Sequence, residues 1–344
     1  MAMAQVLFVS KPVVPPWNDS SKNLVRDIAT SLERHSPVLT GRSRHLGVFR
    51  QLLFATSPDV WHFFFAPNVK TSRAARFARA VRRVPSIHTV CSLPAEEDAI
   101  GNLLFADVTV ALSRAAFERL RLAGVDESAL RLIPPCVPPL SEPGPDRRGE
   151  LRKKHAIPEN TQVWIYPGDL EFGGGAEIAV KGFAAWNRPD ALLLIACRPK
   201  TARAAVERLR LMDLARRWGI ASQVRWLGDT LQIHELLTLS DFVVLVNRSA
   251  YAKMDYPLVA LESMCLARPV LVGRGTPSEE LAELGAAVAV EPDAEALADA
   301  VRRLSADEAS LIELGHRAHS VATSTFSPKQ VAAAYERLYE EIRA

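Results

Sequence analysis

The hydrophobic pattern alternates between two kinds of segment along most of the chain. Short apolar runs rich in β-branched and aromatic residues are typical of buried strands, and the stretches between them have apolar positions at helical spacing. Regular alternation of strand and helix indicates parallel α/β sheets. Because the pattern occurs twice, the sequence predicts two doubly wound domains in tandem.

The first half contains five predicted strands and two predicted helices. The strands are Val6–Ser10, Val60–Phe65, Ser86–Val90, Val108–Leu112 and Leu130–Ile133, and the helices are Ser21–Glu33 and Arg114–Ala123. The second half contains six predicted strands, each followed by a loop and a helical pattern. These strands are Val163–Tyr166, Leu192–Ala196, Val224–Leu227, Phe242–Val246, Val270–Val272 and Ala287–Val290.

The segment PPCVPPLSEPGPDRRGE separates the two halves. Its prolines and glycines cannot continue a helix or a central strand, which indicates a linker. The last segment, FSPKQVAAAYERLYEEIRA, is typical of an amphipathic helix, and we expect it to cross back onto the first domain. The predicted boundaries are 1–142 for an N-terminal domain, 143–157 for the linker, 158–325 for a C-terminal domain and 326–344 for the final helix. Two such domains facing each other should leave a central cleft between the carboxyl edges of their sheets, the usual place for a ligand.

Composition indicates a compartment and argues against a metal site. The longest apolar runs of this 344-residue chain fall well short of the ~18 residues that a membrane span needs. The N-terminus, MAMAQVLFVSKPVV, lacks a charged region followed by a cleavable hydrophobic segment, so we predict a cytoplasmic protein. The four cysteines are scattered without paired ligand spacing, which predicts reduced, buried thiols. They are Cys91, Cys136, Cys197 and Cys265.

The net charge of +3 is unevenly distributed. Residues 1–150 carry 19 Lys and Arg against 14 Asp and Glu, whereas residues 151–344 carry 23 against 25. Much of the excess lies in TSRAARFARAVRRVP, whose arginines recur at helical spacing and share a face. These arginines are Arg73, Arg76, Arg79 and Arg83. Two interpretations remain open, a solvated helix face and a patch that contacts anionic membrane lipid peripherally. Nucleic acid is not expected, because no binding motif occurs.

In KMDYPLVALESMCLARPVLV, Glu262 interrupts an otherwise apolar turn-helix-strand unit. Pro257 suits the first turn of a helix, so helix Leu258–Leu266 should start at the carboxyl edge of a sheet with free backbone amides. The amides of Leu258 and Val259 can then hold phosphate, and Glu262 can accept hydrogen bonds from ribose hydroxyls. The alternative is a buried Glu262 that pairs with a neighbouring arginine.

Six blocks of the sequence resemble the successive blocks of retaining glycosyltransferases of family four. In order they are PPWNDSSKNLVRDIA, LIPPCVPPL, YPGDLEFGGG, VRWLGD, LSDFVVLV and PLVALESMCLARPVLV. The resemblance covers almost the whole chain, and the last block is similar to the family's L-x-E-A-M-A-x-G-x-P-V-V signature. It implies the α/β GT-B fold and transfer of a sugar, with anomeric retention, from a nucleoside diphosphate sugar on the C-terminal domain to an acceptor on the N-terminal domain. It also implies that no metal or other cofactor is required.

Several family positions are substituted. The family usually has two glutamates separated by seven residues; the second is Glu262, but the first is Met254, with Asp255 beside it. The family's G-R-L-x3-K-G block, whose cations neutralise the donor pyrophosphate, has Asp169 and then three glycines. A leaving pyrophosphate needs compensating positive charge, so we expect it from Arg248 or Lys253, or else from Arg198 or Lys200 after strand Leu192–Ala196. The donor-binding residues implied in this way are Gly168, Asp169, Gly174, Arg198, Gly228, Arg248, Lys253, Pro257, Leu258, Val259 and Glu262.

The first domain supplies the candidate catalytic and acceptor residues. Relatives commonly place a histidine that contacts the transferred sugar in a T-x-H sequence; here Thr89-Val90-Cys91 has Cys91 instead, with His88 three positions earlier. The catalytic candidates are therefore His88 and Cys91 in the first domain, together with Asp255 beside the position of the family's first glutamate in the second. For His88, and for His62, we favour a buried structural role.

The loop after the first strand, glycine-rich in relatives, is the candidate acceptor or phosphate loop. It contains Asn18, Asp19, Ser20, Ser21 and Lys22. Ser20 or Ser21 is expected to cap the following helix, whose amides then meet phosphate or acceptor.

We therefore predict a cytoplasmic glycosyltransferase that uses a nucleoside diphosphate sugar. Two alternatives remain open. One is a catalytically silent relative that binds a nucleotide sugar or serves as a partner subunit, which the substituted positions favour. The other is a nucleotide-sugar epimerase on the same fold.

Overall fold

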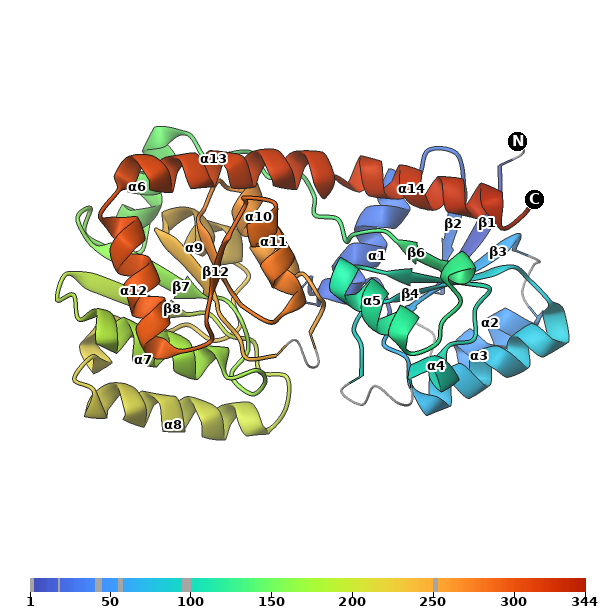
Figure 1. Cartoon of the computed structure of the whole chain (residues 1–344), viewed down its shortest axis with the longest axis horizontal. Helices are drawn as coiled ribbons and strands as arrows, with labels where there is room; N and C mark the ends of the chain where they lie inside the picture. Colours follow the sequence, from blue (N-terminus) through green and yellow to red (C-terminus); the bar gives the residue numbers. More distant parts are fainter. Residues whose placement is uncertain (1–2, 18, 41–44, 55–57, 95–99, 250–252) are drawn as a thin grey trace. The chain divides into compact units, whose positions relative to one another are not determined.

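A computed structural model describes residues 3–17, 19–40, 45–54, 58–94, 100–249 and 253–344 of the chain. The chain divides into two compact units (Figure 1). Unit 1 comprises Met1–Pro138, Tyr251–Leu258 and Phe326–Ala344, and unit 2 comprises Pro139–Ala250 and Val259–Thr325.

Unit 1 is built on a six-stranded parallel sheet in the order β2-β1-β3-β4-β5-β6. Its strands are β1 (Gln5–Val9), β2 (Ser36–Leu39), β3 (Val60–Phe65), β4 (Ser86–Val90), β5 (Val108–Ala111) and β6 (Leu130–Leu132). Its helices are α1 (Ser20–Ser31), α2 (His45–Phe54), α3 (Val69–Arg82), α4 (Ile100–Leu103), α5 (Arg114–Leu122), the short η1 (Glu127–Ala129) and α14 (Pro328–Glu341).

Unit 2 is also built on a six-stranded parallel sheet, but with a different strand order, β12-β11-β10-β7-β8-β9. Its strands are β7 (Gln162–Tyr166), β8 (Ala191–Ile195), β9 (Val224–Trp226), β10 (Phe242–Leu245), β11 (Val270–Gly273) and β12 (Val288–Val290). Its helices are α6 (Pro145–Lys154), α7 (Gly175–Trp186), α8 (Arg203–Arg217), η2 (Ala221–Gln223), α9 (Ile233–Leu239), α10 (Leu258–Cys265), η3 (Pro277–Glu279), α11 (Glu280–Glu283), α12 (Ala294–Ser305) and α13 (Glu308–Thr325). The chain runs from β7 to β9 on one side and then crosses to β10 on the other, so the strand order reverses between β7 and β10. Ligands of doubly wound sheets bind at this kind of position.

The two parallel sheets confirm the predicted fold class. Strands β3 and β4 have the bounds expected from the sequence, and the other expected strands differ by one residue at one end or, for β1 and β8, at both ends. Strand β2 was not expected, because SPVL contains a proline and lies at an exposed sheet edge. Helix α6 lies in the segment expected to be a linker, because Pro145 takes the first helical turn, where no amide donor is lost.

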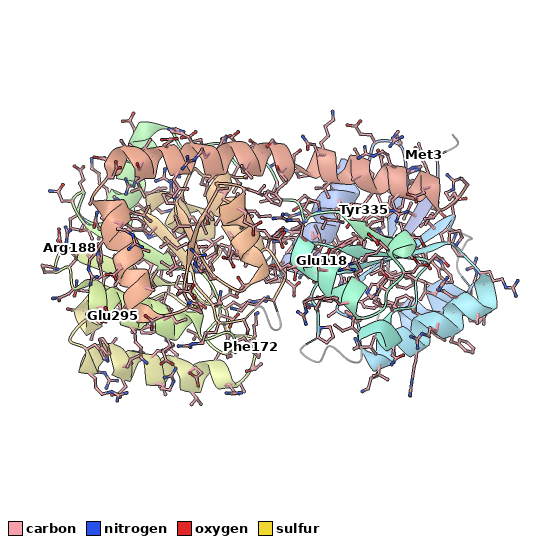
Figure 2. The ribbon with its side chains drawn as sticks, in the orientation of Figure 1. Met3, Glu118, Phe172, Arg188, Glu295 and Tyr335 are labelled. Atoms are coloured by element: carbon pink, nitrogen blue, oxygen red, sulfur yellow. The ribbon has the colours of Figure 1, made fainter. Side chains whose placement is uncertain are left out.

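Helix α14 is tied to the sheet of unit 1 by a buried polar network. His62 on β3 contacts the Tyr339 hydroxyl through Nδ1, at 2.7 Å, and the Thr89 hydroxyl through Nε2, at 2.8 Å. Thr89 in turn lies 3.0 Å from the hydroxyl of Tyr335, which points from α14 toward the sheet (Figure 2). Burial lowers the pKa of His62 well below its ordinary value, so the imidazole is neutral and has one donor and one acceptor to satisfy. The network satisfies both.

Replacing Tyr339 by Phe should destabilise unit 1, because Nδ1 of the buried His62 loses its partner. We expect the free energy of unfolding to fall by about 1–3 kcal/mol, the usual cost of an unsatisfied buried polar group. Urea denaturation followed by tryptophan fluorescence measures it. Tyr335→Phe is the matched control and should cost less, because Thr89 keeps its bond to His62. Equal stabilities of Tyr339→Phe and wild type would contradict this role.

Candidate functional site

The loops after β7 and β10 meet at the carboxyl edge of the unit 2 sheet, where the strand order reverses. The amide of Arg248 donates to the carbonyl of Gly173 at 2.8 Å, which joins the two loops. Asn247 beside it is buried and donates to the carbonyl of Leu245 at 2.8 Å. The backbone of the β10 loop is therefore fixed against the glycine loop before the chain reaches residue 250.

The glycines of the β7 loop make room for side chains of the β10 loop. Gly174 has a positive φ of 67°, and a Cβ atom there would collide with the guanidinium of Arg248. A Cβ atom on Gly175 would collide with the Asn247 amide and would lie 2.8 Å from the Tyr166 hydroxyl. The guanidinium of Arg248 consequently lies directly over the glycine loop, which explains why this loop carries glycines.

Asp169 is buried in the same loop, and its charge is compensated from the β8 loop. One carboxylate oxygen accepts from the amide of Phe172 at 2.8 Å, and the other lies 3.2 Å from Nζ of Lys200. The Lys200 ammonium also lies 5.5 Å from the centre of the Phe172 ring, where a cation–π contact adds to the pairing. Phe172 marks this loop in Figure 2. Arg198, in the same β8 loop, is partly exposed.

Glu262 lies on α10 and has a histidine, not an arginine, as its partner. Its side chain is 13% exposed, and Oε2 lies 3.5 Å from Nε2 of His234 on α9. The hydrogen bond to Glu262 raises the pKa of His234 and outweighs partial burial, which acts to lower it. Upstream on the same edge, Gly228 makes the turn after β9 with a φ of 69°.

Three of the expected donor-binding residues belong to unit 1. Lys253, Pro257 and Leu258 lie in the segment that the division groups with the first sheet. Leu258 is also the first residue of α10, and the rest of that helix, from Val259 on, belongs to unit 2.

Asp255 is buried and bound to the end of a helix in unit 1. The Ser113 hydroxyl donates to Oδ2 of Asp255 at 2.8 Å and accepts from the amide of Ala116 as the N-cap of α5. Nearby Cys91 is buried at the end of β4, and the charges of Lys11 and Asp255 reach it. Burial raises the pKa of the Cys91 thiol to about 12, so it stays protonated at neutral pH. Neither arrangement provides an activated nucleophile.

His88 is buried as well, in agreement with the structural role favoured from the sequence. Its Nε2 lies 3.0 Å from the carbonyl oxygen of Phe65, and its ring stacks on Phe105 at 4.8 Å. Burial lowers the pKa of His88 to about 4, which keeps it neutral.

The cap of α1 differs from the expectation. The N-cap is Asp19, not Ser20 or Ser21, and it accepts hydrogen bonds from the amides of Ser21 and Lys22 at 3.1 and 3.3 Å. Burial acts to raise the pKa of Asp19, but hydrogen bonds from Ser21 and Lys11 outweigh it and lower the pKa to about 2. A carboxylate takes this place because it can accept from two amides and Lys11 together. Since Asp19 occupies these amides, a phosphate would meet a negative charge there. The remaining expected loop residue, Asn18, lies outside the described residues.

Sequence reasoning missed the residues that support this site from a distance. Asn247, Ser113 and His234 each act through a contact with a residue far away in the sequence. Tyr166 donates to the carbonyl of Asp169, three residues away, and no local motif marks any of the four. Within the described parts of the chain, no group of three or more His, Cys, Asp or Glu side chains is placed to hold a metal ion. The same parts contain no helix long and apolar enough to cross a membrane.

His234→Gln should lower stability in acid and leave it unchanged in alkali. The folded pKa of His234 is raised above its ordinary value of 6.5, so the pair with Glu262 stabilises fully below about pH 6.5 and loses its effect as the pH rises through the raised pKa. Because His234 is half exposed, we expect the substitution to lower the free energy of unfolding by about 0.5 kcal/mol at pH 5.5 and to leave it unchanged at pH 9. Urea denaturation at the two pH values measures this difference. In a Glu262→Gln background the same substitution should have no pH-dependent effect. A pH-independent difference in the wild-type background would contradict the pair.

Comparisons with known proteins agree with this fold. The family model described as glycosyl transferases group 1 matches residues 147–321. Among solved structures, HepE of Anabaena in complex with UDP-glucose is 17% identical, with a TM-score of 0.83 and coverage of 98% of this chain and 100% of that one. Sucrose-phosphate synthase of Thermosynechococcus elongatus is 19% identical, with a TM-score of 0.77 and coverage of 98% and 99%. A glycosyltransferase of Rickettsia africae is 16% identical, with a TM-score of 0.76 and coverage of 99% and 98%. These likenesses show the fold, and a search of curated protein sequences gave no match.

Proposed function

The chain belongs to the glycosyl transferases group 1 family, and on that premise we propose that it moves a sugar, with retention, from a nucleoside diphosphate sugar to an acceptor hydroxyl. The observation that carries the proposal is the guanidinium of Arg248 over the glycine loop, at the edge where the strand order reverses. A diphosphate is the chemical group that this arrangement suits, because an arginine offers a fork of donors to phosphate oxygens. The UDP-glucose bound to HepE supports a uridine diphosphate sugar as the donor.

The two cations that relatives carry in the glycine loop are replaced from neighbouring loops. Counted along the family block, the arginine position is Asp169 and the lysine position is Gly174. Lys200 neutralises Asp169, and Arg248 fills the space above Gly174. We therefore assign contact with the pyrophosphate to Arg248 and neutralisation of Asp169 to Lys200. Positive charge at this edge is restored without a side chain on the glycine loop.

The neighbouring elements α9 and α10 and the turn after β9 are proposed to bind the rest of the donor. Glu262, held by His234, is placed to accept hydrogen bonds from the ribose hydroxyls. The amides of Leu258 and Val259 in the first turn of α10 add donors for phosphate, since the first four amides of a helix lack internal partners. Gly228, whose positive φ turns the chain after β9, is assigned to the base.

In the proposed reaction the bond from the sugar C1 to the β-phosphate oxygen breaks and a bond from C1 to the acceptor oxygen forms. Negative charge develops on the leaving β-phosphate oxygen and is stabilised by Arg248, and that oxygen takes the proton that the acceptor hydroxyl loses. His88 and Cys91 are not assigned to this step, because both are buried in hydrogen-bonded structural positions. Asp255 is assigned to holding its loop on α5 through Ser113. The four free, buried cysteines support a reducing compartment such as the cytoplasm.

Replacing Arg248 by Gln should weaken nucleoside diphosphate binding without unfolding the protein. A charge-assisted hydrogen bond contributes about 1.5–3 kcal/mol, so calorimetric titration with UDP should show affinity lower by about 10- to 100-fold. Arg188→Gln is the matched control, because Arg188 is an exposed arginine of the same unit that precedes β8, at the opposite edge of the sheet. An affinity of Arg248→Gln equal to that of the control would reject the assignment.

The reaction class is tested by incubating the protein with a panel of nucleotide sugars in the absence of acceptor. Slow release of nucleoside diphosphate and a sugar of unchanged configuration is expected, because water then replaces the acceptor. An epimeric product would show an epimerase instead. Donor binding without any turnover would show a catalytically silent relative.

A further inference from the structure

Helices α2 and α3 of unit 1 lie side by side and expose large apolar side chains (Figure 1). The exposed fractions are 79% for Phe54, 57% for Phe77, 57% for Val81 and 52% for Val69. Three of the four lie on α3 at spacings of eight and four residues, and Arg73 lies midway between the first two, so they are on the same side of the helix. The ring of Phe77 lies 5.9 Å from that of Phe49 on α2, which makes the exposed surface continuous across both helices. Exposed apolar side chains that lie together in this way mark an interaction surface, whereas single scattered ones do not.

The same two helices carry only positive charge. Neither α2 nor α3 contains an Asp or Glu. Their cations are Arg50, Lys70, Arg73, Arg76, Arg79 and Arg82, and Arg83 follows as the C-cap of α3. A surface that combines one sign of charge with exposed apolar groups suits a partner that is negative at its surface and apolar beneath it.

The structure separates the four arginines of the sequence pattern into two pairs with different roles. Arg76 donates to the backbone carbonyls of Asn102 and Leu104, and Arg79 donates to the carbonyl of Phe105 and pairs with Asp107. These two hold the β4–β5 connection on α3. Over the residues that the structure describes, the side chains of Arg73 and Arg83 form no hydrogen bond or ion pair, and both are exposed. They remain available to an external anion.

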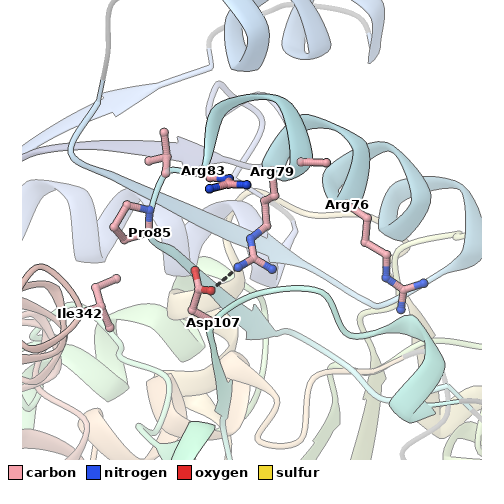
Figure 3. A pocket seen from close by; sticks show the side chains of 8 residues that line it. Arg76, Arg79, Arg83, Pro85, Asp107 and Ile342 are labelled. Atoms are coloured by element: carbon pink, nitrogen blue, oxygen red, sulfur yellow. Dashed lines mark hydrogen bonds and ion pairs between the residues drawn. The ribbon is translucent and has the colours of Figure 1, made fainter.

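A hollow with a volume of about 600 Å³ opens at the C-terminal end of α3, beside Arg83. It is lined by Arg76, Arg79, Arg83, Pro85, Asp107 and Ile342 (Figure 3). Figure 3 shows Arg79 turned toward Asp107, whereas Arg83 makes no bond to the residues drawn. Three guanidinium groups face one carboxylate here, so the hollow keeps an excess of positive charge suited to a phosphate group.

We propose that the outer face of α2 and α3 docks on a bilayer surface rich in anionic phospholipid. Phe54, Phe77 and Val81 enter the interfacial region, and Arg73 and Arg83 bind lipid phosphates. Exposed valines favour a bilayer over nucleic acid, because a valine has no ring on which a base can stack. A second copy of the chain is disfavoured, because two surfaces of the same charge repel each other. The docking itself does not depend on the proposed function. Only its consequence does, namely that the enzyme meets its acceptor at a membrane.

Co-sedimentation with vesicles tests the docking without donor or acceptor. Vesicles of phosphatidylcholine alone are compared with vesicles containing 30 mol% phosphatidylglycerol. Both are tested at about 50 and 500 mM salt, because the distance over which charges act is about threefold shorter at the higher concentration. We expect the protein to pellet with the anionic vesicles at low salt and to stay in solution with the neutral ones. Binding should weaken at least tenfold at high salt.

Variants separate the contribution of charge from that of apolar insertion. Arg73→Gln with Arg83→Gln should reduce binding about 20- to 30-fold, since each cation near the surface contributes about fivefold. Phe77→Ser with Val81→Ser should reduce it about tenfold and leave the salt dependence unchanged. The matched control is Arg216→Gln with Arg217→Gln on α8 of unit 2, which removes the same charge from side chains that are 61% and 66% exposed.

Three results would overturn the docking proposal. The first is equal pelleting with neutral and anionic vesicles, or none with either at low salt. The second is an equal loss in the α8 control, which would show nonspecific attraction. The third is a concentration-dependent dimer that the Phe77 and Val81 substitutions abolish, which would assign the face to a second copy. UDP titration on the same samples separates failure of docking from failure of the proposed donor site, because none of the substituted residues is assigned to that site.

Discussion

The candidate site depends on the placement of positive charge at the carboxyl edge of the unit 2 sheet. A buried Asp169 in a loop proposed to face a diphosphate is tolerable only with a cation beside it, and Lys200 supplies that cation from the next strand along the sheet. Arg248 supplies the second cation over Gly174. Space for this guanidinium exists because Gly174 has no side chain. Gly175 in turn leaves room for Asn247 and for the Tyr166 hydroxyl. The cation that relatives carry in the glycine loop is thus supplied here by Arg248 of the β10 loop, at the same edge of the sheet.

Unit 1 also has a six-stranded parallel sheet, but the residues at its carboxyl edge differ in charge. Asp19 occupies the amides at the start of α1, and Asp255 accepts from the Ser113 hydroxyl that caps α5. An anion would therefore meet carboxylates at both places, whereas a neutral hydroxyl acceptor would meet none of that repulsion. The difference between the two edges fits a donor that is a diphosphate and an acceptor group that is uncharged where it reacts. Helix α14 completes unit 1 through His62 and Tyr339, so the last segment of the chain is part of the first sheet's core.

The sheets could be predicted from the sequence because each strand is an apolar run of its own. The supporting contacts could not, because they join distant positions. Lys200 and Asp169 are 31 residues apart, and only the pairing of β7 with β8 brings them together. The alternative interpretation of Glu262 named an arginine partner, but the residue beside it is His234, since α9 and α10 are placed by tertiary packing. At α1 the sequence offers three adjacent residues able to cap a helix, and the local geometry selects Asp19 because it also binds Lys11. In the arginine-rich helix, period alone could not show that Arg76 and Arg79 are bound to backbone carbonyls.

The central claim is that a nucleoside diphosphate binds at the edge formed by the β7 and β10 loops. A crystal structure of the protein with bound UDP tests it most directly. The account predicts phosphate oxygens within hydrogen-bonding distance of the Arg248 guanidinium and ribose hydroxyls on the Glu262 carboxylate, with Lys200 still paired to Asp169. A diphosphate bound away from this edge, or an Arg248 turned away from a diphosphate that does bind there, would contradict it.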